Sequence, residues 1–350
     1  MSKIEWTEKT WNPVIGCSKA SAGCANCYAL RMAARMASNP ATPQYQGVAE
    51  FNHTPSGQNF VDRAADWLEN GCKPRWLSVK CLPKKLAEPL KRRKPTMYFV
   101  NSMSDLFHES VPFEFIAAVF GVMAATPQHT YQILTKRAER MGRWFEIMPR
   151  EPVKYWLHEA VKWGMGYHHP NRPAINHADW PLPNVWLGVS VEDQAAADER
   201  ISYLLNCPAA VRFVSCEPLL GAPNLSEWLW KTPHIDRSRL DWVIVGGETG
   251  PRARPMHPDW ARSIRDQCQA AGVPFFFKSF GDFLGYSELY LDGIFHAPDG
   301  IRWVEGHDIF NDPDRAWRID GDVAFDRVGK KTAGRLLDGR EWDEMPGGAE

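Results

Sequence analysis

The segment WVIVGGETGPRARPMHPDWARSIRDQCQAAGVPFFF, residues 242–277, decides the fold class. It opens with an apolar, β-rich run, Trp242–Val245, and closes with a second one, Pro274–Phe277. Pro258-Asp259 is typical of a helix start and Gly272 of a helix stop, so a helix is predicted over 258–271. Neither run alternates polar with apolar residues, which is typical of strands buried on both faces. The segment therefore predicts a β-α-β unit of a parallel sheet.

Similar runs recur along most of the chain. They are Trp11–Ile15, Trp76–Val79, Met97–Val100, Tyr131–Leu134, Val185–Val189 and Val211–Val214. Helix-compatible stretches follow several of them, including Phe113–Ala125 and Asp193–Leu205. Together the runs predict strands from about residue 11 to about residue 281, a length that matches the ~250 residues of a (β/α)8 barrel. We expect an α/β fold with a (β/α)8-like TIM barrel, complete or distorted, over residues 1–281. An open doubly wound sheet is the alternative.

Three stretches fall outside the barrel pattern. Residues 38–74 are polar with Pro, Gly and Asn, and residues 151–183 carry Trp and His residues among prolines. Both are interpreted as loop insertions, either lids over a site or ordinary surface excursions. After residue 281, short runs and turns predict a small β-rich C-terminal appendage over residues 282–350.

The composition gives no global sign of a charged partner. Lys and Arg number 41 against 42 Asp and Glu, for a formal net charge of −1, so no basic field indicates nucleic acid or a membrane surface. The amino terminus has no apolar h-region, and no run of about 18 apolar residues occurs, so we expect no signal peptide and no spanning helix. The chain is expected to be cytoplasmic, where its eight cysteines are not a disulfide framework.

Three cysteines are crowded into one short segment. Cys17, Cys24 and Cys27 form a C-x6-C-x2-C pattern directly after the first predicted strand, in a loop of small residues that can wrap a metal centre. A structural zinc site needs a fourth Cys or His, and none lies between Cys27 and His53. A [4Fe–4S] cluster on three cysteines leaves one iron open for a substrate or cofactor, so the pattern favours this cluster. Zinc with a distant fourth ligand and three unligated thiols remain alternatives. The other five cysteines are interpreted as mostly packing residues.

Polar residues follow the predicted strands at their carboxyl ends, where barrel enzymes place their chemistry. They are Asn101, Ser102, Ser104, Asp105, Thr135, Lys136, Arg137, Ser190, Glu192, Ser215, Glu217, Gly246, Gly247, Glu248 and Lys278. The candidate catalytic residues are Lys136, Glu217, Glu248 and Lys278. The candidate cofactor-binding residues are Asn101, Ser102, Ser190 and Glu217. Any one of them taken alone could instead be a helix cap or a rim salt bridge. Arg252 and Arg254 could clamp an anion or pair with an acid.

Longer motifs carry a family resemblance. They are WNPVIGC at 11–17, SAGCANCYA at 21–29, NSMSDLF at 101–107, LTKR at 134–137, WLGVSVE at 186–192, FVSCEPLLG at 213–221, VGGE at 245–248 and GKKTAGRLLDG at 329–339. Over about residues 3–346 the chain resembles the phage Gp37/Gp68 family, a domain family of unknown function (DUF5131) found in phages and bacteria. If the chain is phage-encoded, the resemblance implies the cytoplasm of the bacterial host.

The cysteine triplet also looks like a variant of the radical S-adenosylmethionine superfamily, in the branch that includes spore photoproduct lyase. This resemblance implies a [4Fe–4S] cluster on Cys17, Cys24 and Cys27, with S-adenosyl-L-methionine bound at the open iron. It implies a 5′-deoxyadenosyl radical that abstracts hydrogen from a nucleobase or nucleic-acid substrate, in modification or repair of phage DNA. It further implies an electron donor such as flavodoxin or ferredoxin. No membrane partner is expected, since no run of about 18 apolar residues occurs. A non-enzymatic, zinc-stabilised nucleic-acid-binding phage protein is the alternative.

The chain departs from that superfamily at two places. The usual spacing is C-x3-C-x2-C with an aromatic residue before the third cysteine, whereas here the first gap is six and Asn26 precedes Cys27. The superfamily's early Gly-Gly-Glu motif holds the methionine amino group, whereas Gly246-Gly247-Glu248 comes late, so that role is not transferred. The basic stretches Lys84-Lys85 and Lys91–Lys94 could contact phosphates or form a solvated face.

Overall fold

The computed structural model describes residues 4–52, 73–149, 152–165, 181–230, 239–285, 316–319 and 323–347. The chain divides into two compact units, and each is described by itself. Unit 1 comprises residues 1–189 and 202–212, and unit 2 comprises residues 190–201 and 213–350. Helix α7 (Gln194–Asn206) has residues in both.

Unit 1 is built on four parallel strands. Their order is β1 (Lys9–Trp11), β6 (Met97–Val100), β7 (Thr130–Thr135) and β8 (Val185–Ser190). Tyr131, Ile133 and Leu187 in these strands are buried, as the lack of polar alternation in the sequence predicts. Two short antiparallel pairs accompany them, β2 (Val14–Ile15) with β5 (Lys80–Cys81) and β3 (Ala49–Phe51) with β4 (Pro74–Trp76).

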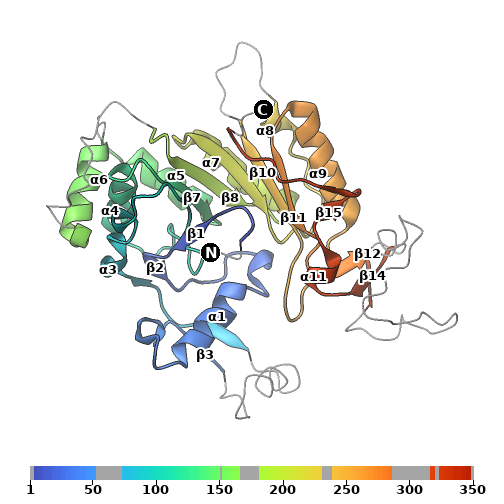
Figure 1. Ribbon diagram of the computed structural model, residues 1–350, viewed down its shortest axis with the longest axis horizontal. Helices are drawn as coiled ribbons and strands as arrows, with labels where there is room; N and C mark the ends of the chain where they lie inside the picture. The colour runs from blue at the N-terminus through green and yellow to red at the C-terminus, as the bar shows by residue number, and fades with distance from the viewer. Residues whose placement is uncertain are drawn as a thin grey trace. The chain divides into compact units, whose positions relative to one another are not determined.

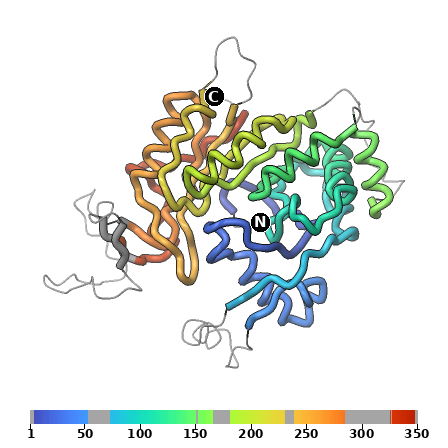
Figure 2. The backbone as a smooth tube through the Cα atoms, turned by 180° about the vertical axis from the view of Figure 1, so that it is seen from behind, coloured from blue at the N-terminus to red at the C-terminus, as the bar shows by residue number. Residues whose placement is uncertain are grey.

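Three helices of unit 1, α4 (Phe113–Ala124), α5 (Ala138–Glu146) and α6 (Pro152–Ala160), share a group of aromatic side chains. Unit 1 also contains helix α1 (Tyr28–Ala37) and the short helices α3 (Pro83–Leu86), η1 (Ala22–Cys24), η2 (Pro43–Tyr45), η3 (Pro89–Lys91) and η4 (Val161–Met165). Phe120 of α4 lies 5.0 Å from Trp156 of α6, ring centroid to ring centroid, and Trp144 of α5 stacks on Trp156 at 5.6 Å. Helices α4 and α6 run side by side in both views (Figures 1 and 2).

The close approach of α4 and α6 depends on one glycine. A Cβ atom at Gly121 would lie 2.1 Å from the carbonyl oxygen of Trp156, well inside the 3.0 Å below which real Cβ contacts essentially never occur. Residues 152–160, in the predicted insertion at 151–183, are therefore a helix packed in the core, with Trp156 fully buried. The insertion's residues 166–180 lie outside the described part of the chain, as do residues 53–72 of the insertion at 38–74.

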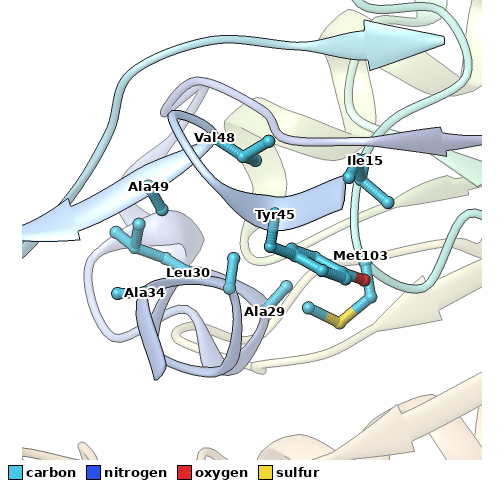
Figure 3. Close-up of a cluster of buried hydrophobic side chains, with 9 residues drawn as sticks. Ile15, Ala29, Leu30, Ala34, Tyr45, Val48, Ala49 and Met103 are labelled. Carbon is cyan, nitrogen blue, oxygen red and sulfur yellow. The ribbon is translucent and has the colours of Figure 1, made fainter. Parts of the chain in front are cut away.

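A smaller apolar cluster supports the start of the chain. It combines residues of α1 with Ile15, Tyr45, Val48, Ala49 and Met103, and the Tyr45 ring lies beside the Met103 side chain (Figure 3). Cys27, the residue before α1, packs against this cluster. The cluster thus fixes the helix that begins where the cysteine segment ends.

Unit 2 is built on three parallel strands flanked by a helix. The strands are β9 (Val211–Cys216), β10 (Trp242–Gly246) and β11 (Phe275–Ser279), with β10 in the middle. Helix α9 (Pro258–Ala271) covers β10 and β11 and ends at Gly272, which has the left-handed φ of +62° that a glycine C-cap allows. The helix α8 (Ser226–Leu229) packs against α9.

The end of the chain packs onto unit 2 as a set of short strands. Strands β12 (Phe283–Gly285), β14 (Val323–Arg327) and β13 (Ala316–Ile319) form an antiparallel sheet, and β15 (Leu336–Leu337) pairs with β16 (Arg340–Glu341) after the short helix α11 (Lys330–Ala333). The Phe277 backbone N–H donates to the Trp342 carbonyl at 2.8 Å, and the Trp242 indole N–H donates to the Glu344 carbonyl at 2.8 Å. The last described segment therefore borders β11.

Parallel strands combined with helices confirm the mixed α/β class, but two predicted strands were misplaced. Of the predicted strand Trp76–Val79, Trp76 lies on a strand, at the end of β4, and the rest was wrong. Leu77 is 46% exposed, and the Leu77 and Ser78 backbone N–H groups both donate to the Val48 carbonyl. Pro13 has no N–H to donate, and the predicted strand 11–15 is split there into β1 and β2. The described residues therefore supply seven parallel strands, four in unit 1 and three in unit 2, instead of the eight expected.

None of the helices in the described ranges is long and apolar enough to cross a membrane.

Candidate functional site

Both ends of the cysteine segment are tied to the residues that follow β6. The Gly16 backbone N–H donates to the Met103 carbonyl at 3.2 Å, and the Tyr28 hydroxyl donates to the Ser102 carbonyl at 2.7 Å. The segment from Cys17 to Cys27, which we call the thiol loop, is therefore anchored at its two ends on one short stretch of chain.

Gly16 is required at the start of the thiol loop. Its φ of +88° is strained for any other residue, and a Cβ atom there would lie 2.1 Å from the Ser78 carbonyl oxygen. The backbone consequently enters the loop through a turn that only glycine accommodates.

The three thiols of the loop are free and half-buried. Burial raises the pKa of the Cys17 thiol to about 12; the Asp105 carboxylate adds to this rise, and Arg137 partly offsets it. Burial also raises the pKa of Cys27, against the charge of Lys136, which lowers it. Cys17 interacts electrostatically with Cys27, and Cys27 with Cys24. The metal-free thiols at Cys17 and Cys27 are thus protonated at neutral pH and must release protons to bind a metal.

Arg137, directly before α5, reaches the thiol loop with both terminal nitrogens of its guanidinium group. Nη1 donates to the Cys17 sulfur at 3.8 Å, and Nη2 donates to the Ser18 hydroxyl at 2.8 Å and the Ser18 carbonyl at 3.2 Å. Nε donates to Glu109 at 3.0 Å, and Nη1 also pairs with Asp105 at 3.1 Å. Burial lowers the pKa of Arg137, but Asp105, Cys17 and Glu109 more than offset this, so the side chain stays charged.

Asp105 holds Arg137 in place through an ion pair to Nη1. Its carboxylate accepts from the Thr135 hydroxyl at 2.7 Å, the Phe107 N–H at 2.9 Å and the Lys136 N–H at 3.1 Å. The carboxylate thus ties the residues after β6 to those after β7. Both side chains of the Asp105–Arg137 pair are only 8% exposed.

His108 also contacts the loop, and its hydrogen bonds define its tautomer. The Ser110 backbone N–H donates to His108 Nδ1 at 3.1 Å, so the proton of the neutral ring lies on Nε2. Nε2 is 2.9 Å from the Ser18 hydroxyl oxygen and donates to it. Burial, reinforced by the charge of Arg137, lowers the pKa of His108, which keeps the ring neutral at pH 7.

The donor set has the ligand type of an iron–sulfur cluster, but the three thiols are not arranged around one metal ion. Within the described ranges, no group of three or more His, Cys, Asp and Glu side chains is arranged to hold a metal ion. Three free thiols in one loop are, however, the ligand type that Fe–S clusters take, and a cationic side chain at Cys17 suits an anionic cluster. The thiols must converge further before they can share one centre.

The predicted site residues of unit 1 directly follow β6 and β7. Asn101 has a φ of +60° and is 2% exposed; its Oδ1 accepts from the Val14 N–H at 3.2 Å, and its Nδ2 is buried without a hydrogen-bond partner among the described residues. The Ser102 hydroxyl donates to the Asn12 side chain at 3.2 Å. Lys136 is close enough to Cys27 to influence its pKa.

In unit 2, Glu217 and Lys278 lie together. Lys278 Nζ is 3.1 Å from Glu217 Oε2, and the side chains are 25% and 16% exposed, respectively. Glu217 Oε1 is buried without a hydrogen-bond partner in the described residues, and a Cβ at Gly246 would lie 2.6 Å from it. The glycine therefore leaves the space that the carboxylate fills.

The remaining strand-end acids of unit 2 belong to ion pairs. Glu192 pairs with Arg200 at 2.8 Å, and Arg200 also donates to the Ser190 carbonyl at 2.8 Å. Glu248 receives two side-chain hydrogen bonds and one backbone hydrogen bond from Arg254. Of the two arginines considered as an anion clamp, Arg254 is thus engaged by Glu248.

Sequence reasoning missed Ser18, His108 and Glu109. These residues do not follow a strand directly, and they reach Arg137 or each other across long sequence separations. The only local signal is their position next to residues that were identified, since Ser18 follows Cys17 and His108 lies three residues after Asp105.

Comparison with other proteins identifies the family. No curated protein and no solved structure matches the chain. A family profile described as a protein of unknown function (DUF5131) matches residues 1–346, which covers nearly the whole chain, and the chain therefore belongs to this family.

Proposed function

We propose that the protein is a radical S-adenosylmethionine enzyme that holds a [4Fe–4S] cluster on Cys17, Cys24 and Cys27. The observation that carries the proposal is the thiol loop itself, which holds three free thiols that interact electrostatically. Arg137 donates a hydrogen bond to the Cys17 sulfur, and the charge of Lys136 lowers the pKa of Cys27. The seven parallel strands agree with a full or partial (β/α)8 barrel, in which chemistry lies at the strand carboxyl ends.

A bound cluster with an open iron would supply one-electron chemistry to S-adenosyl-L-methionine. The chain's own residues contribute to the site in three ways. The anchors at Gly16 and Tyr28 fix the two ends of the loop. The Asp105–Arg137 pair keeps a buried positive charge at Cys17, and the Nδ2 of Asn101 is a buried hydrogen-bond donor without a partner among the described residues.

A zinc-stabilised, non-enzymatic nucleic-acid-binding protein is the second candidate. One observation favours it: His108 is a histidine close to the loop in space but distant in sequence, as a fourth zinc ligand would be. Against it, the nitrogen that faces the loop carries the proton, because Nδ1 already accepts from Ser110. A zinc ligand needs a free lone pair on that nitrogen, so the iron–sulfur proposal is favoured.

We propose a nucleobase or nucleic acid as the substrate class, with an electron donor such as flavodoxin or ferredoxin. Lys91, Arg93 and Lys94 are exposed and lie next to one another, so they can approach phosphates. If they do, affinity for a DNA duplex falls steeply with salt, and neutralising all three to Gln reduces the slope of log K against log[salt] by about 0.9 per lost contact. A flat salt response contradicts a role for this stretch in binding.

The proposal is tested by anaerobic purification and reconstitution with iron and sulfide. We expect visible iron–sulfur absorption, about four irons and four sulfides per chain for this cluster type, and release of 5′-deoxyadenosine when S-adenosyl-L-methionine and a reductant are added. A Cys17→Ala, Cys24→Ala, Cys27→Ala triple variant should lose all three signals. Cys81→Ala is the matched control, since Cys81 is also a free, half-buried thiol of unit 1.

The outcomes separate the two candidates. Zinc without sulfide in the wild-type protein supports the nucleic-acid-binding alternative. Iron and sulfide that persist in the triple variant contradict the proposed cluster ligands.

A further inference from the structure

Arg137 makes more contacts with the thiol loop than an ordinary ion pair requires. Glu109 and Asp105 together already balance its charge, at 3.0 and 3.1 Å. The remaining donors reach the Ser18 hydroxyl, the Ser18 carbonyl and the Cys17 sulfur. A residue that served only the ion pairs would have no need of these three contacts.

The two groups of contacts have different physical effects. The bonds to Ser18 fix the backbone immediately after Cys17, which limits where the Cys17 sulfur can lie. The bond to the Cys17 sulfur places a positive charge at a metal-ligand atom, and it partly offsets the negative charge of Asp105 there. The planar fork of a guanidinium allows both at once, which a lysine ammonium does not.

We infer that Arg137 is the positioning residue of the thiol loop: it holds Cys17 through Ser18 and tunes the cluster by donating to the Cys17 sulfur. This inference rests on the proposed function, because it assigns Arg137 to the proposed cluster. Hydrogen bonds to cluster sulfur atoms stabilise the more negative, reduced state and so raise the reduction potential. Loss of Arg137 should therefore weaken cluster retention and lower the midpoint potential.

The experiment compares Arg137→Gln and Arg137→Lys with the wild-type protein after anaerobic reconstitution. Iron and sulfide per chain, retention of iron against a chelator, and the midpoint potential of the bound cluster are measured. Loss of a group that orients a metal ligand typically costs 10- to 100-fold in metal affinity, so we expect iron retention in Arg137→Gln to fall by about that factor. The cluster it retains should have a more negative midpoint potential. Arg137→Lys keeps the charge without the fork, so its potential should lie between the other two.

Arg140→Gln is the matched control. Arg140 lies three residues after Arg137, on α5, and it contacts the Val111 carbonyl and the Phe113 ring rather than the thiol loop. This variant should retain iron and the wild-type potential. Equal iron retention and equal potential in Arg137→Gln and wild-type protein would overturn the inference.

A metal-free measurement separates this inference from the proposed function. Hydrogen exchange of the segment 16–19 in the metal-free protein should be faster in Arg137→Gln than in wild-type protein or Arg140→Gln, because the Ser18 anchors are lost. If the wild-type protein takes up no iron–sulfur cluster, the proposed function and the tuning role both fail, and faster exchange still supports the holding role. Unchanged exchange overturns the holding role whatever the metal result. Arg137→Lys and a melting curve for each variant show that the effects are not global unfolding.

Discussion

The two units place charged residues at strand ends in different ways. In unit 1, one cation, Arg137, is shared among two carboxylates, a loop backbone and a thiol. In unit 2, three strand-end carboxylates each pair with a different cation: Glu192 with Arg200, Glu248 with Arg254 and Glu217 with Lys278. In unit 1, a polar residue after a strand thus binds another segment of the chain, the thiol loop. In unit 2, the polar residues after strands mostly form ion pairs.

This difference separates residues that act on the thiol loop from residues that hold a unit together. A carboxylate that serves the loop should change metal loading when it is altered. A carboxylate that only pairs with its own arginine should change the free energy of unfolding and leave metal loading intact. The predictions below test that separation, beginning with the largest expected effect.

Glu192→Ala should give the largest loss of stability. The Glu192 and Arg200 side chains are 2% and 4% exposed, and removing one partner of a buried pair costs about 3–5 kcal/mol. Arg200 would then rely on a longer ion pair, at 3.8 Å, with the exposed Glu199. Urea unfolding measures the loss, and iron content after reconstitution should stay at the wild-type value. Glu50→Ala, in the exposed pair with Arg75, is the control and should cost no more than about 1 kcal/mol.

Asp105→Asn should reduce both stability and metal loading. Asn lacks the negative charge that balances Arg137, although Glu109 still pairs with it, so we expect a cost of about 2–3 kcal/mol in the free energy of unfolding. Because the Asp105–Arg137 ion pair is lost, Arg137 should hold the thiol loop less firmly, and the iron bound per chain should also fall. Wild-type iron content in a folded Asp105→Asn protein would contradict the distinction between the units.

Glu248→Gln is the counterpart of this change in unit 2. Arg254 is 26% exposed and can turn to water, so we expect a smaller cost of about 1–2 kcal/mol from the weakened hydrogen bonds. Thermal unfolding followed by circular dichroism measures it. Iron content should not change, and a loss of iron as large as that in Asp105→Asn would contradict the distinction between the two units.

Asp338→Asn should have the smallest effect and should depend on pH. Burial raises the pKa of Asp338, but hydrogen bonds from Arg265 and Arg262 more than offset this and leave it below its ordinary value. A lowered folded-state pKa gives stability that is present above the unfolded pKa of about 3.9 and is lost as pH falls through the folded value. The side chain is 38% exposed, so the contribution at pH 7 should stay below about 1 kcal/mol. Unfolding at pH 7 and pH 3 compares the two proteins, and their difference should shrink at pH 3.

The strands that could be predicted from sequence are those buried on both faces. The runs at 97–100, 131–134, 185–189, 211–214, 242–245 and 274–277 all fall on strands of the parallel sheets, with bounds shifted by at most two residues. Helix α9 matches its prediction at both ends, because Pro258 and Gly272 terminate it through backbone chemistry that is local. The run at 76–79 misled because its apolar composition resembles that of a buried strand while Leu77 faces solvent.

The candidate site could be predicted only in part. Cysteine spacing picked out the thiol loop, and strand-end position picked out Asp105 and Arg137. Nothing local shows that Ser18 meets His108, since the two residues are 90 positions apart and only the folded backbone joins them. The pairing of Glu192 with Arg200 was equally hidden, because a helix face rather than a strand end presents the arginine.

The clamp on Cys17 also has a consequence for synthesis on the ribosome. Arg137 is 120 residues downstream of Cys17, so the thiol loop is made well before the side chain that holds it. At a translation rate of roughly 5–20 residues per second, the loop waits about 6–24 s for its clamp. During this interval the Cys17 thiol lacks its hydrogen bond from Arg137, so if the loop binds the proposed cluster, cysteine oxidation competes with metal delivery before the clamp forms.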